Sequence, residues 1–202
     1  MSDVTDAPAL DITSAVKDIL STIDRERERE IIARRFGLYD RKETLEQIGE
    51  LLGITRERVR QLEKAIMIRL KIAAEDALPH IDRLEKVMVR HLYDLGGIAR
   101  VTELTSRANP DSGDRERAHV AFIAELAPRL AVVEENDQYY HSVGLKEQYD
   151  EKQIKKFVDE IVGAIKQHGQ PLTADELHEK VNHNHPDHVR ALASVSKNLA
   201  NL

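Results

Sequence analysis

The stretch TLEQIGELLGITRERVRQLEKA, from Thr44 to Ala65, decides the fold. Thr44 is followed three residues later by Gln47, which is the capping-box pattern that starts a helix. The apolar residues that follow recur at helical spacing: Leu45, Ile48, Leu51 and Leu52. The first half of the stretch therefore predicts a short amphipathic helix that ends at Gly53.

The second half predicts another helix, set at an angle to the first. Gly53 is typical of a tight turn, Ile54 fills the angle, and Thr55 is a favoured N-cap residue. Three apolar residues of this helix are expected to face inward: Val59, Leu62 and Ile66. Two short helices joined by a glycine turn predict a helix-turn-helix, whose second helix can enter the major groove of DNA.

Polar side chains remain on the outer face of this second helix: Arg56, Glu57, Arg58, Arg60, Gln61 and Lys64. Arginine can pair with guanine through two hydrogen bonds, glutamine can pair with adenine, and glutamate can accept from cytosine. Such a mixture favours base reading over a simple attraction to phosphates. The spacing alone leaves a second interpretation open, in which the pair of helices is structural and its basic face is solvated.

The formal net charge of -6 does not exclude a nucleic-acid partner. From Thr55 to Lys71 the chain has six Lys and Arg residues against two Glu residues, a local charge of +4. Because net charge averages over modules, the local value is the one that bears on DNA binding. The alternating charges from Asp24 to Glu30 are interpreted more simply, as the solvated face of a helix.

The stretches from Arg27 to Leu38 and from Thr44 to Ala65 closely resemble region 4 of the sigma-70 family. In particular, TRERVRQLE (Thr55 to Glu63) is similar to the recognition helix of that family. The resemblance implies that four residues contact bases of the minus-35 promoter element: Arg56, Glu57, Arg60 and Gln61. It implies that three others support or touch the phosphate backbone: Thr55, Arg58 and Lys64. It also implies that the part around Arg27 to Phe36 packs on the recognition unit and faces the β-flap of RNA polymerase.

The whole chain is predicted to be mainly α-helical, with a helix-turn-helix domain followed by two winged-helix modules. The expected parts are a flexible lead-in at 1–11, the region-4-like domain at 12–75, a winged helix at 80–146 and a second one at 150–202. The second module would end where its wing should begin, so it either lacks a wing or is truncated. Through AIKQHGQPLTADELHEKV (Ala164 to Val181) it loosely resembles winged helices of the delta subunit of bacterial RNA polymerase and of restriction-associated proteins.

Within the first winged helix, a long helix from Ile81 to Leu95 should keep four apolar residues at core spacing: Leu84, Val87, Met88 and Leu92. A strand from Ile98 to Val101, a helix from Thr102 and a helix ending at Arg129 are expected next. The module should close with a β-hairpin made of two strands: Leu130 to Val133 and Gln138 to Val143.

The second winged helix is expected to begin with a helix from Lys152 to His168, which Gly169 stops. Pro171 and Leu172 are the candidate for its short strand, and Thr173 is expected to cap the next helix. A final helix should start at Pro186 and present four apolar residues: Val189, Leu192, Val195 and Leu199.

Other features narrow the class of protein. The chain has no cysteine, which excludes disulfides and cysteine-based zinc sites. It has neither a signal-peptide pattern nor a continuous apolar run of the roughly 20 residues that a membrane helix needs, so we expect a cytoplasmic, nucleoid-associated protein without membrane contact. Four clustered histidines do not have the spacing of a zinc-protease helix and are interpreted as a polar loop: His178, His183, His185 and His188.

No glycine-rich phosphate loop, nucleophile motif or nuclease-like carboxylate cluster is present, so we expect no enzymatic activity, cofactor or metal. The sequence thus predicts a DNA-binding transcription regulator whose partners are double-stranded DNA, the polymerase β-flap and a second copy of the chain. Two rival hypotheses stay open. The chain could be the DNA-targeting arm of a larger enzyme, such as a nuclease or defence-system protein, or an adaptor that binds the polymerase flap. Whether the winged helices contact DNA or proteins also stays open.

Overall fold

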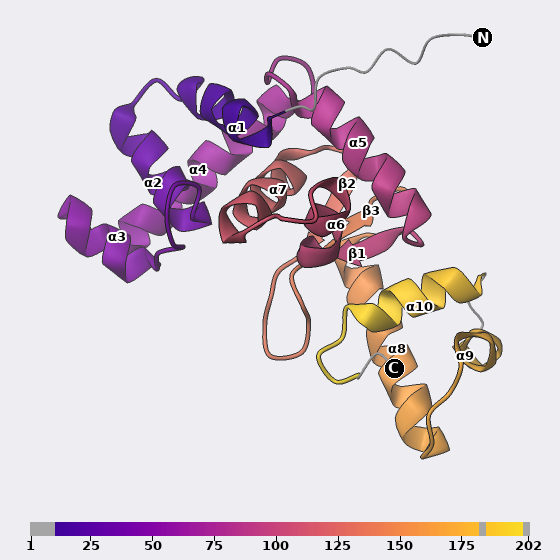
Figure 1. Ribbon diagram of the computed structural model, residues 1–202. Coiled ribbons are helices and arrows are strands. Elements are labelled where there is room, and N and C mark those ends of the chain that lie inside the picture. The colour runs from indigo at the N-terminus through magenta and orange to yellow at the C-terminus, as the bar shows by residue number, and fades with distance from the viewer. Residues whose placement is uncertain (1–10, 182–184, 200–202) are drawn as a thin grey trace, which may run out of the picture. The chain divides into compact units, whose positions relative to one another are not determined.

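Residues 11–181 and 185–199 are described by a computed structural model, and this part of the chain is mainly α-helical with one small antiparallel sheet (Figure 1). The contacts divide the chain into two compact units. Unit 1 contains Met1–Leu84 and Gly113–Leu126, and unit 2 contains Glu85–Ser112 and Ala127–Leu202. The chain therefore crosses between the two units three times. No described helix combines the length and the apolar character that crossing a bilayer requires.

Unit 1 is helical. It contains α1 (Ile12–Ser21), α2 (Glu26–Phe36), α3 (Leu45–Leu52), α4 (Arg56–Ala74), the first turn of α5 (Ile81–Asp94) and α7 (Asp114–Leu126). Asp11 caps the first helix, because its side chain accepts a hydrogen bond from the Thr13 amide at 3.0 Å.

The charged run that starts α2 is not simply a solvated face. Glu28 is only 8% exposed, and its carboxylate pairs with Arg69 of α4 and, at 3.5 Å, with Arg25. The interpretation of the whole run from Asp24 to Glu30 as solvent-facing was therefore wrong at this residue. The reason is tertiary, since an arginine 41 positions later brings its charge to the same place.

Helix α7 packs on α1 and α4 although it is distant from both in sequence. The rings of Phe36 and Phe122 lie 5.1 Å apart between centroids, and the Lys71 ammonium lies 2.5 Å from the Glu125 carboxylate. The buried His119 donates from Nε2 to the Leu38 carbonyl at 2.7 Å. These contacts tie the end of α2 and the last turn of α4 to a helix outside the predicted region-4-like domain.

Unit 2 is built on a three-stranded sheet covered by helices. Besides the rest of α5 it contains β1 (Ile98–Arg100), α6 (Val101–Ala108), β2 (Leu130–Val133), β3 (Ser142–Leu145), α8 (Glu151–His168), α9 (Ala174–Val181) and α10 (Pro186–Ser194). The strand order is β1-β3-β2, and β3 pairs antiparallel with both neighbours. Buried residues from the sheet, α8, α9 and α10 share one apolar core, centred on Ile98, Val133, Ile154, Val158 and Leu192.

The hairpin strand expected from Gln138 to Val143 was placed too early, because β3 begins at Ser142. Residues 138–140 instead pair with the segment that follows α10. The Tyr140 amide donates to the Val195 carbonyl at 2.9 Å, and the Lys197 amide donates to the Gln138 carbonyl at 2.8 Å. This partner segment lies more than fifty residues away, so no local pattern could have predicted the pairing.

Other expectations also need correction. No strand forms at Pro171 and Leu172, and α10 ends at Ser194, so Val195 and Leu199 follow the helix. On α5, Val87 is 41% exposed and Val89 takes a buried place instead. The helix expected to reach Arg129 ends at Leu126, two residues before Pro128.

The order α5, β1, α6, α7, β2, β3 follows the order expected of a winged helix. Because the contacts of α7 group it with unit 1, the winged-helix assignment stays a prediction. The predicted starts of the later helices are close to those observed. Asp150 forms a capping box with Gln153 at the start of α8, and Gly169 ends that helix in the left-handed region at φ 71°.

Candidate nucleic-acid interface

A small apolar core holds α2, α3 and α4 together. Ile31, Ile48 and Val59 are fully buried at its centre. Partly buried residues surround them: Leu45, Leu52, Ile54 and Leu62. Most of the apolar positions expected from helical spacing lie here, but Leu51 was wrongly expected to face the core and is 54% exposed. The core fixes one side of α4 and leaves the opposite side of its first turns exposed.

The turn between α3 and α4 depends on two glycines. Gly53 adopts φ +64°, a left-handed conformation that glycine tolerates best. Gly49 has no such conformation, but a Cβ there would lie 2.7 Å from the Ile54 carbonyl oxygen. The missing side chain therefore lets α3 approach the backbone of the turn, and this approach helps to set the angle of α4.

Both predicted caps of the helix-turn-helix are confirmed. The Thr44 hydroxyl accepts the Gln47 amide at 3.2 Å, and the Gln47 side chain accepts the Thr44 amide at 2.8 Å. At the start of α4, the Thr55 hydroxyl accepts the Arg58 amide at 3.1 Å. These local bonds satisfy backbone amides that would otherwise lack partners at the helix starts.

Helix α2 packs on α3 and α4, as the resemblance implies, and two arginines whose contacts were not predicted individually link it to them. The Arg27 guanidinium donates to the Leu52 carbonyl at the end of α3 at 2.6 Å. The Arg35 guanidinium lies 3.2 Å from the Glu63 carboxylate on α4. Both are cross-helix contacts, so only the alternating-charge composition of α2 could have hinted at them.

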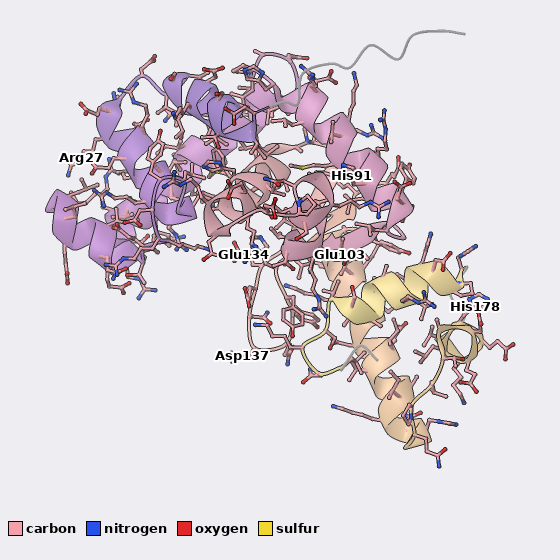
Figure 2. All side chains as sticks on the ribbon, viewed as in Figure 1. Arg27, His91, Glu103, Glu134, Asp137 and His178 are labelled. Carbon is pink, nitrogen blue, oxygen red and sulfur yellow. The ribbon has the colours of Figure 1, made fainter. Side chains whose placement is uncertain are left out.

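All seven predicted site residues are exposed on the N-cap and first turns of α4: Thr55, Arg56, Glu57, Arg58, Arg60, Gln61 and Lys64. Figure 2 shows the side chains around this end of unit 1, with Arg27 labelled on α2. The structure thus brings the predicted base-reading and phosphate-contacting groups to one surface. This arrangement follows from the helix period, since Val59 and Ile66 occupy the buried side.

In the free protein these side chains bind one another. Arg60 donates two hydrogen bonds to the Glu57 carboxylate, at 2.8 and 2.7 Å, and Gln61 donates a third at 3.3 Å. Arg56 pairs with Glu46 of α3 at 2.9 Å. Within the described residues, the Lys64 side chain has no hydrogen bond or ion pair.

The hydrogen bonds from Arg60 lower the pKa of Glu57 to about 2, and the same bonds raise the pKa of Arg60. Both groups therefore stay charged at neutral pH. The side chains of Arg60 and Glu57 are 54% and 59% exposed, respectively, so solvent screens the pair. Such a pair can separate with little loss of free energy, and its side chains can then form hydrogen bonds to DNA instead.

Residues 25–71 match the family model of sigma-70, region 4. This segment is a sigma-70 region 4 module. Its match contains α2, α3 and nearly all of α4, which are the helices that build the exposed surface.

Two curated relatives match over the same part of the chain. RNA polymerase sigma factor SigA from Bacillus sp. is 44% identical over 57 residues, which is 28% of this chain and 15% of the relative. RNA polymerase sigma factor sigB from Arabidopsis thaliana is 50% identical over 46 residues, which is 22% of this chain and 8% of the relative. The chain thus spans only a small part of the length of these relatives. No solved structure matches it significantly.

Two basic residues beside the region 4 helix-turn-helix were missed. Arg41 and Lys42 are exposed in the loop before α3, next to the exposed Tyr39. Neither side chain has an ion pair within the described residues. Their position just before the Thr44 cap is the sequence signal, because phosphates favour the N-terminal end of a helix.

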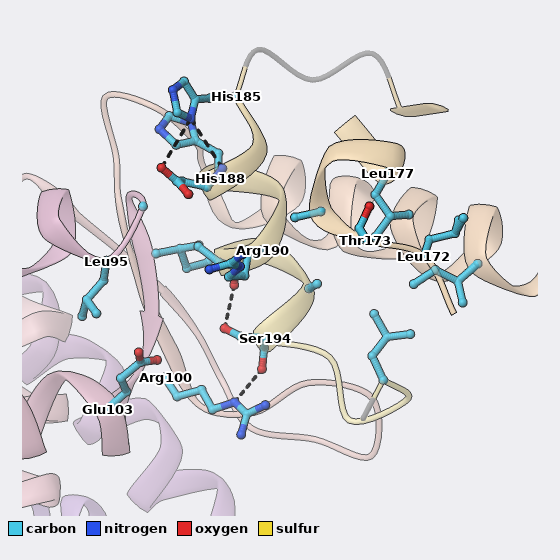
Figure 3. Close-up of a pocket in the computed structure, with 18 of the residues that line it drawn as sticks. Leu95, Arg100, Glu103, Leu172, Thr173, Leu177, His185, His188, Arg190 and Ser194 are labelled. Carbon is cyan, nitrogen blue, oxygen red and sulfur yellow. Dashed lines mark hydrogen bonds and ion pairs between the residues drawn. The ribbon is translucent and has the colours of Figure 1, made fainter. Parts of the chain in front are cut away.

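The later helices offer a poorer surface to DNA than α4 does. Seven of the thirteen residues of α7 are buried, and α10 packs against β1, α8 and α9. Figure 3 shows Arg100 reaching across to the Ser194 carbonyl, at 2.5 Å, beside a groove that has Arg190 and Glu103 in its lining. The β2–β3 loop carries three exposed acids, two of them labelled in Figure 2: Glu134, Glu135 and Asp137.

Among the described residues, the clustered histidines do not converge on one point. His185 and His188 lie 5.7 Å apart between ring centroids, and His183 lies outside the described residues. Within the described part of the chain, no group of three or more His, Asp or Glu side chains could hold a metal ion. Burial lowers the pKa of His188, and the nearby His185 lowers it further.

Proposed function

We propose that the chain is a sequence-specific DNA-binding transcription regulator that reads minus-35-like promoter DNA with the first turns of α4. The observation that supports this best is the exposure of all seven motif residues on one surface of a region 4 module. Sigma-70 region 4 is a DNA-binding module without enzymatic activity, and it implies interaction with DNA and with RNA polymerase.

Base reading is assigned to four residues: Arg56, Glu57, Arg60 and Gln61. In the free protein Glu57 accepts bonds from two of the others, which holds the group on one side of the helix. On DNA the arginines can turn to guanine, Gln61 can pair with adenine, and Glu57 can accept from the amino group of cytosine. These groups are exposed and solvent screens their ion pairs. Replacing the internal bonds by bonds to DNA therefore costs little free energy.

Phosphate contact is assigned to three further residues: Thr55, Arg58 and Lys64. The Thr55 hydroxyl oxygen accepts the Arg58 amide, and its proton remains available for a phosphate oxygen. Lys64 has no partner among the described residues and is ready for a phosphate. We add Arg41 and Lys42 to this group, because both are exposed at the start of α3.

The two rival hypotheses make different demands. A DNA-targeting arm of a larger enzyme requires a catalytic domain in the full-length reading frame. An adaptor for the polymerase β-flap would use the α2 side of the module, where Phe36 and Leu38 already contact α7. Of the two rivals, the adaptor does not require the Arg60 side chain to read bases. Contact with the polymerase, a homodimer and the two winged-helix modules remain proposals beside promoter reading.

The test is a fluorescence-anisotropy titration at physiological salt. A duplex that bears a TTGACA-like element is compared with a scrambled duplex, using the wild type, Arg60→Ala and the control Arg115→Ala, which removes an exposed arginine of α7. We expect the wild type and the control to prefer the TTGACA-like duplex. Arg60→Ala should reduce that preference roughly 10- to 100-fold, as expected for the loss of a bidentate base contact. Equal binding of both duplexes by the wild type, or no binding at all, would refute promoter reading.

A further inference from the structure

The two arginines assigned to base reading are held in different ways. The Nη1 atom of Arg56 lies 2.9 Å from a carboxylate oxygen of Glu46, which belongs to α3. Arg60 instead donates from Nε and Nη2 to Glu57, three residues before it on α4 itself. Glu46 is not among the residues assigned to DNA contact, so the proposed function gives this acid no role.

The Glu46 carboxylate is carried by a well-anchored part of α3. Glu46 lies in the first turn of the helix, where the capping box of Thr44 and Gln47 fixes the backbone. The helix dipole also favours an acid in this turn. One turn further along, Gly49 brings α3 close to the start of α4, because a Cβ there would lie 3.4 Å from the Arg56 amide nitrogen. The packing of the two helices therefore places Glu46 within reach of the Arg56 side chain.

The other acid near Arg56 is already occupied. The hydrogen bonds from Arg60 lower the pKa of Glu57 most, and the charge of Arg56 lowers it further. Both carboxylate oxygens of Glu57 nevertheless accept hydrogen bonds from other side chains, those of Arg60 and Gln61. Within the described residues, the Arg56 side chain has no ion pair besides the one with Glu46. Glu46 is thus the acid that orients this arginine.

The ion pair leaves most of the Arg56 donors available. A guanidinium has five N–H groups in one plane, and the pair with Glu46 uses the Nη1 side. The edge formed by Nε and Nη2 remains, and two neighbouring donors of this kind fit the O6 and N7 acceptors of guanine. Arg60 already uses the same edge on Glu57. Arg56 can therefore contact guanine while it keeps Glu46, whereas Arg60 has to release Glu57 to use that edge.

We infer that Glu46 is a positioning residue for base reading, whose ion pair orients the Arg56 side chain toward guanine. This role rests on the proposed function, because it requires a DNA duplex against α4. The side chains of Arg56 and Glu46 are 67% and 55% exposed, so the pair is weak in the free protein. Its attraction strengthens when DNA excludes water from this surface. An arginine that is already oriented also loses less side-chain freedom on binding. A carboxylate repels phosphates, so Glu46 contributes to specificity and not to overall affinity.

The test measures which base pairs each variant of the full chain discriminates. Anisotropy titrations compare the TTGACA-like duplex with duplexes in which each base pair of the element is changed in turn. Arg56→Ala identifies the base pair that Arg56 reads, as the one where a change no longer matters. Glu46→Gln keeps the shape of the side chain and removes its charge. It should lower discrimination at that same base pair roughly 2- to 10-fold and leave the other base pairs unaffected. Affinity for the scrambled duplex should not fall, because a negative charge near the phosphates is removed.

Two controls separate position from charge and from folding. Glu50→Gln removes the same charge one turn further along α3, from an exposed side chain without a hydrogen bond or ion pair to any described residue. This control should leave discrimination unchanged at every base pair. Glu46→Gln combined with Arg56→Ala should discriminate no worse than Arg56→Ala alone, because the arginine that Glu46 positions is gone.

Four results would overturn this role of Glu46 and leave promoter reading intact. Unchanged discrimination in Glu46→Gln, or an equal loss at every base pair, would show that Glu46 does not act through Arg56. An equal change in Glu50→Gln would assign the effect to charge alone. Sharper discrimination would mean that Glu46 competes with guanine for Arg56. A wild type that does not prefer the TTGACA-like duplex is a different result, because it refutes promoter reading and the positioning role together.

Discussion

Replacing Gly49 by alanine tests whether the close approach of α3 to the turn sets the position of the reading helix. Inside a helix, alanine is favoured over glycine by about 1 kcal/mol. Here the new Cβ would lie 2.7 Å from the Ile54 carbonyl oxygen and 3.4 Å from the Arg56 amide nitrogen. Both neighbours are backbone atoms of the turn and of α4, so the backbone itself must move.

Overpacking by one methyl group typically costs about 1–3 kcal/mol. After the gain in helix propensity, Gly49→Ala should destabilise unit 1 by about 0–2 kcal/mol. Gly163→Ala is the matched control, because Gly163 lies inside α8 and nothing is within 4 Å of its added Cβ. The control should stabilise unit 2 by about 1 kcal/mol, so the two substitutions should differ by about 1–3 kcal/mol.

Hydrogen exchange followed by mass spectrometry reads peptides of the two units separately. Peptides of α3 and α4 should exchange as fast as in the wild type or faster in Gly49→Ala, whereas peptides of α8 should exchange more slowly in Gly163→Ala. The two effects should differ by a factor of about 5 to 150. Gly49→Ala should also weaken the preference for the TTGACA-like duplex, since the turn carries α4. If Gly49→Ala slows exchange as much as the control does, the close approach does not constrain the turn and the reasoning fails.

Two further predictions concern a cap and a histidine. Thr55→Ala removes the acceptor of the Arg58 amide and should cost about 1 kcal/mol of helix stability, whereas Thr55→Ser should keep the hydrogen bond. Equal thermal unfolding temperatures for the two variants would contradict the role of Thr55 as a cap. Burial lowers the folded-state pKa of His188, so the unfolded chain binds that proton more tightly. The stability of unit 2 should therefore fall as pH drops through about 6.5 and level off below the folded pKa. Urea unfolding at pH 7.5 and 5.5 should show a smaller fall for His188→Gln, and an identical fall would refute this.

The acidic partner of the reading arginine adds no pH dependence in the neutral range. Glu57 has a pKa of about 2 in the folded protein, below its ordinary value of 4.5. Its contribution is therefore complete above about 4.5 and is lost only as pH falls through about 2. Promoter reading by α4 should not titrate through this group at physiological pH.

Some expectations failed because they treated each segment alone. The run at Asp24–Glu30 looked solvated, yet Glu28 is buried beside an arginine of α4. Val87 has core spacing but is exposed, because the side of α5 that becomes covered depends on which elements pack there. Residues 138–140 looked like part of a hairpin and instead pair with the segment after α10.

The sequence by itself determined the helix-turn-helix. Its signals act over three or four residues: a hydroxyl that caps a helix, a glycine that adopts a left-handed turn, and apolar residues at the helix period. The helix period predicts which residues of α4 are buried, and therefore which are exposed. The residues of the candidate site could thus be predicted from the sequence alone.

Only the tertiary structure decided how the remaining helices are used. Helix α7 belongs by contact to unit 1, α10 is covered on several sides, and the buried Glu85 of α5 accepts the backbone amide of Arg129. Each of these facts depends on contacts between residues dozens of positions apart. Such contacts are selected by the packing of whole elements, which local spacing does not encode.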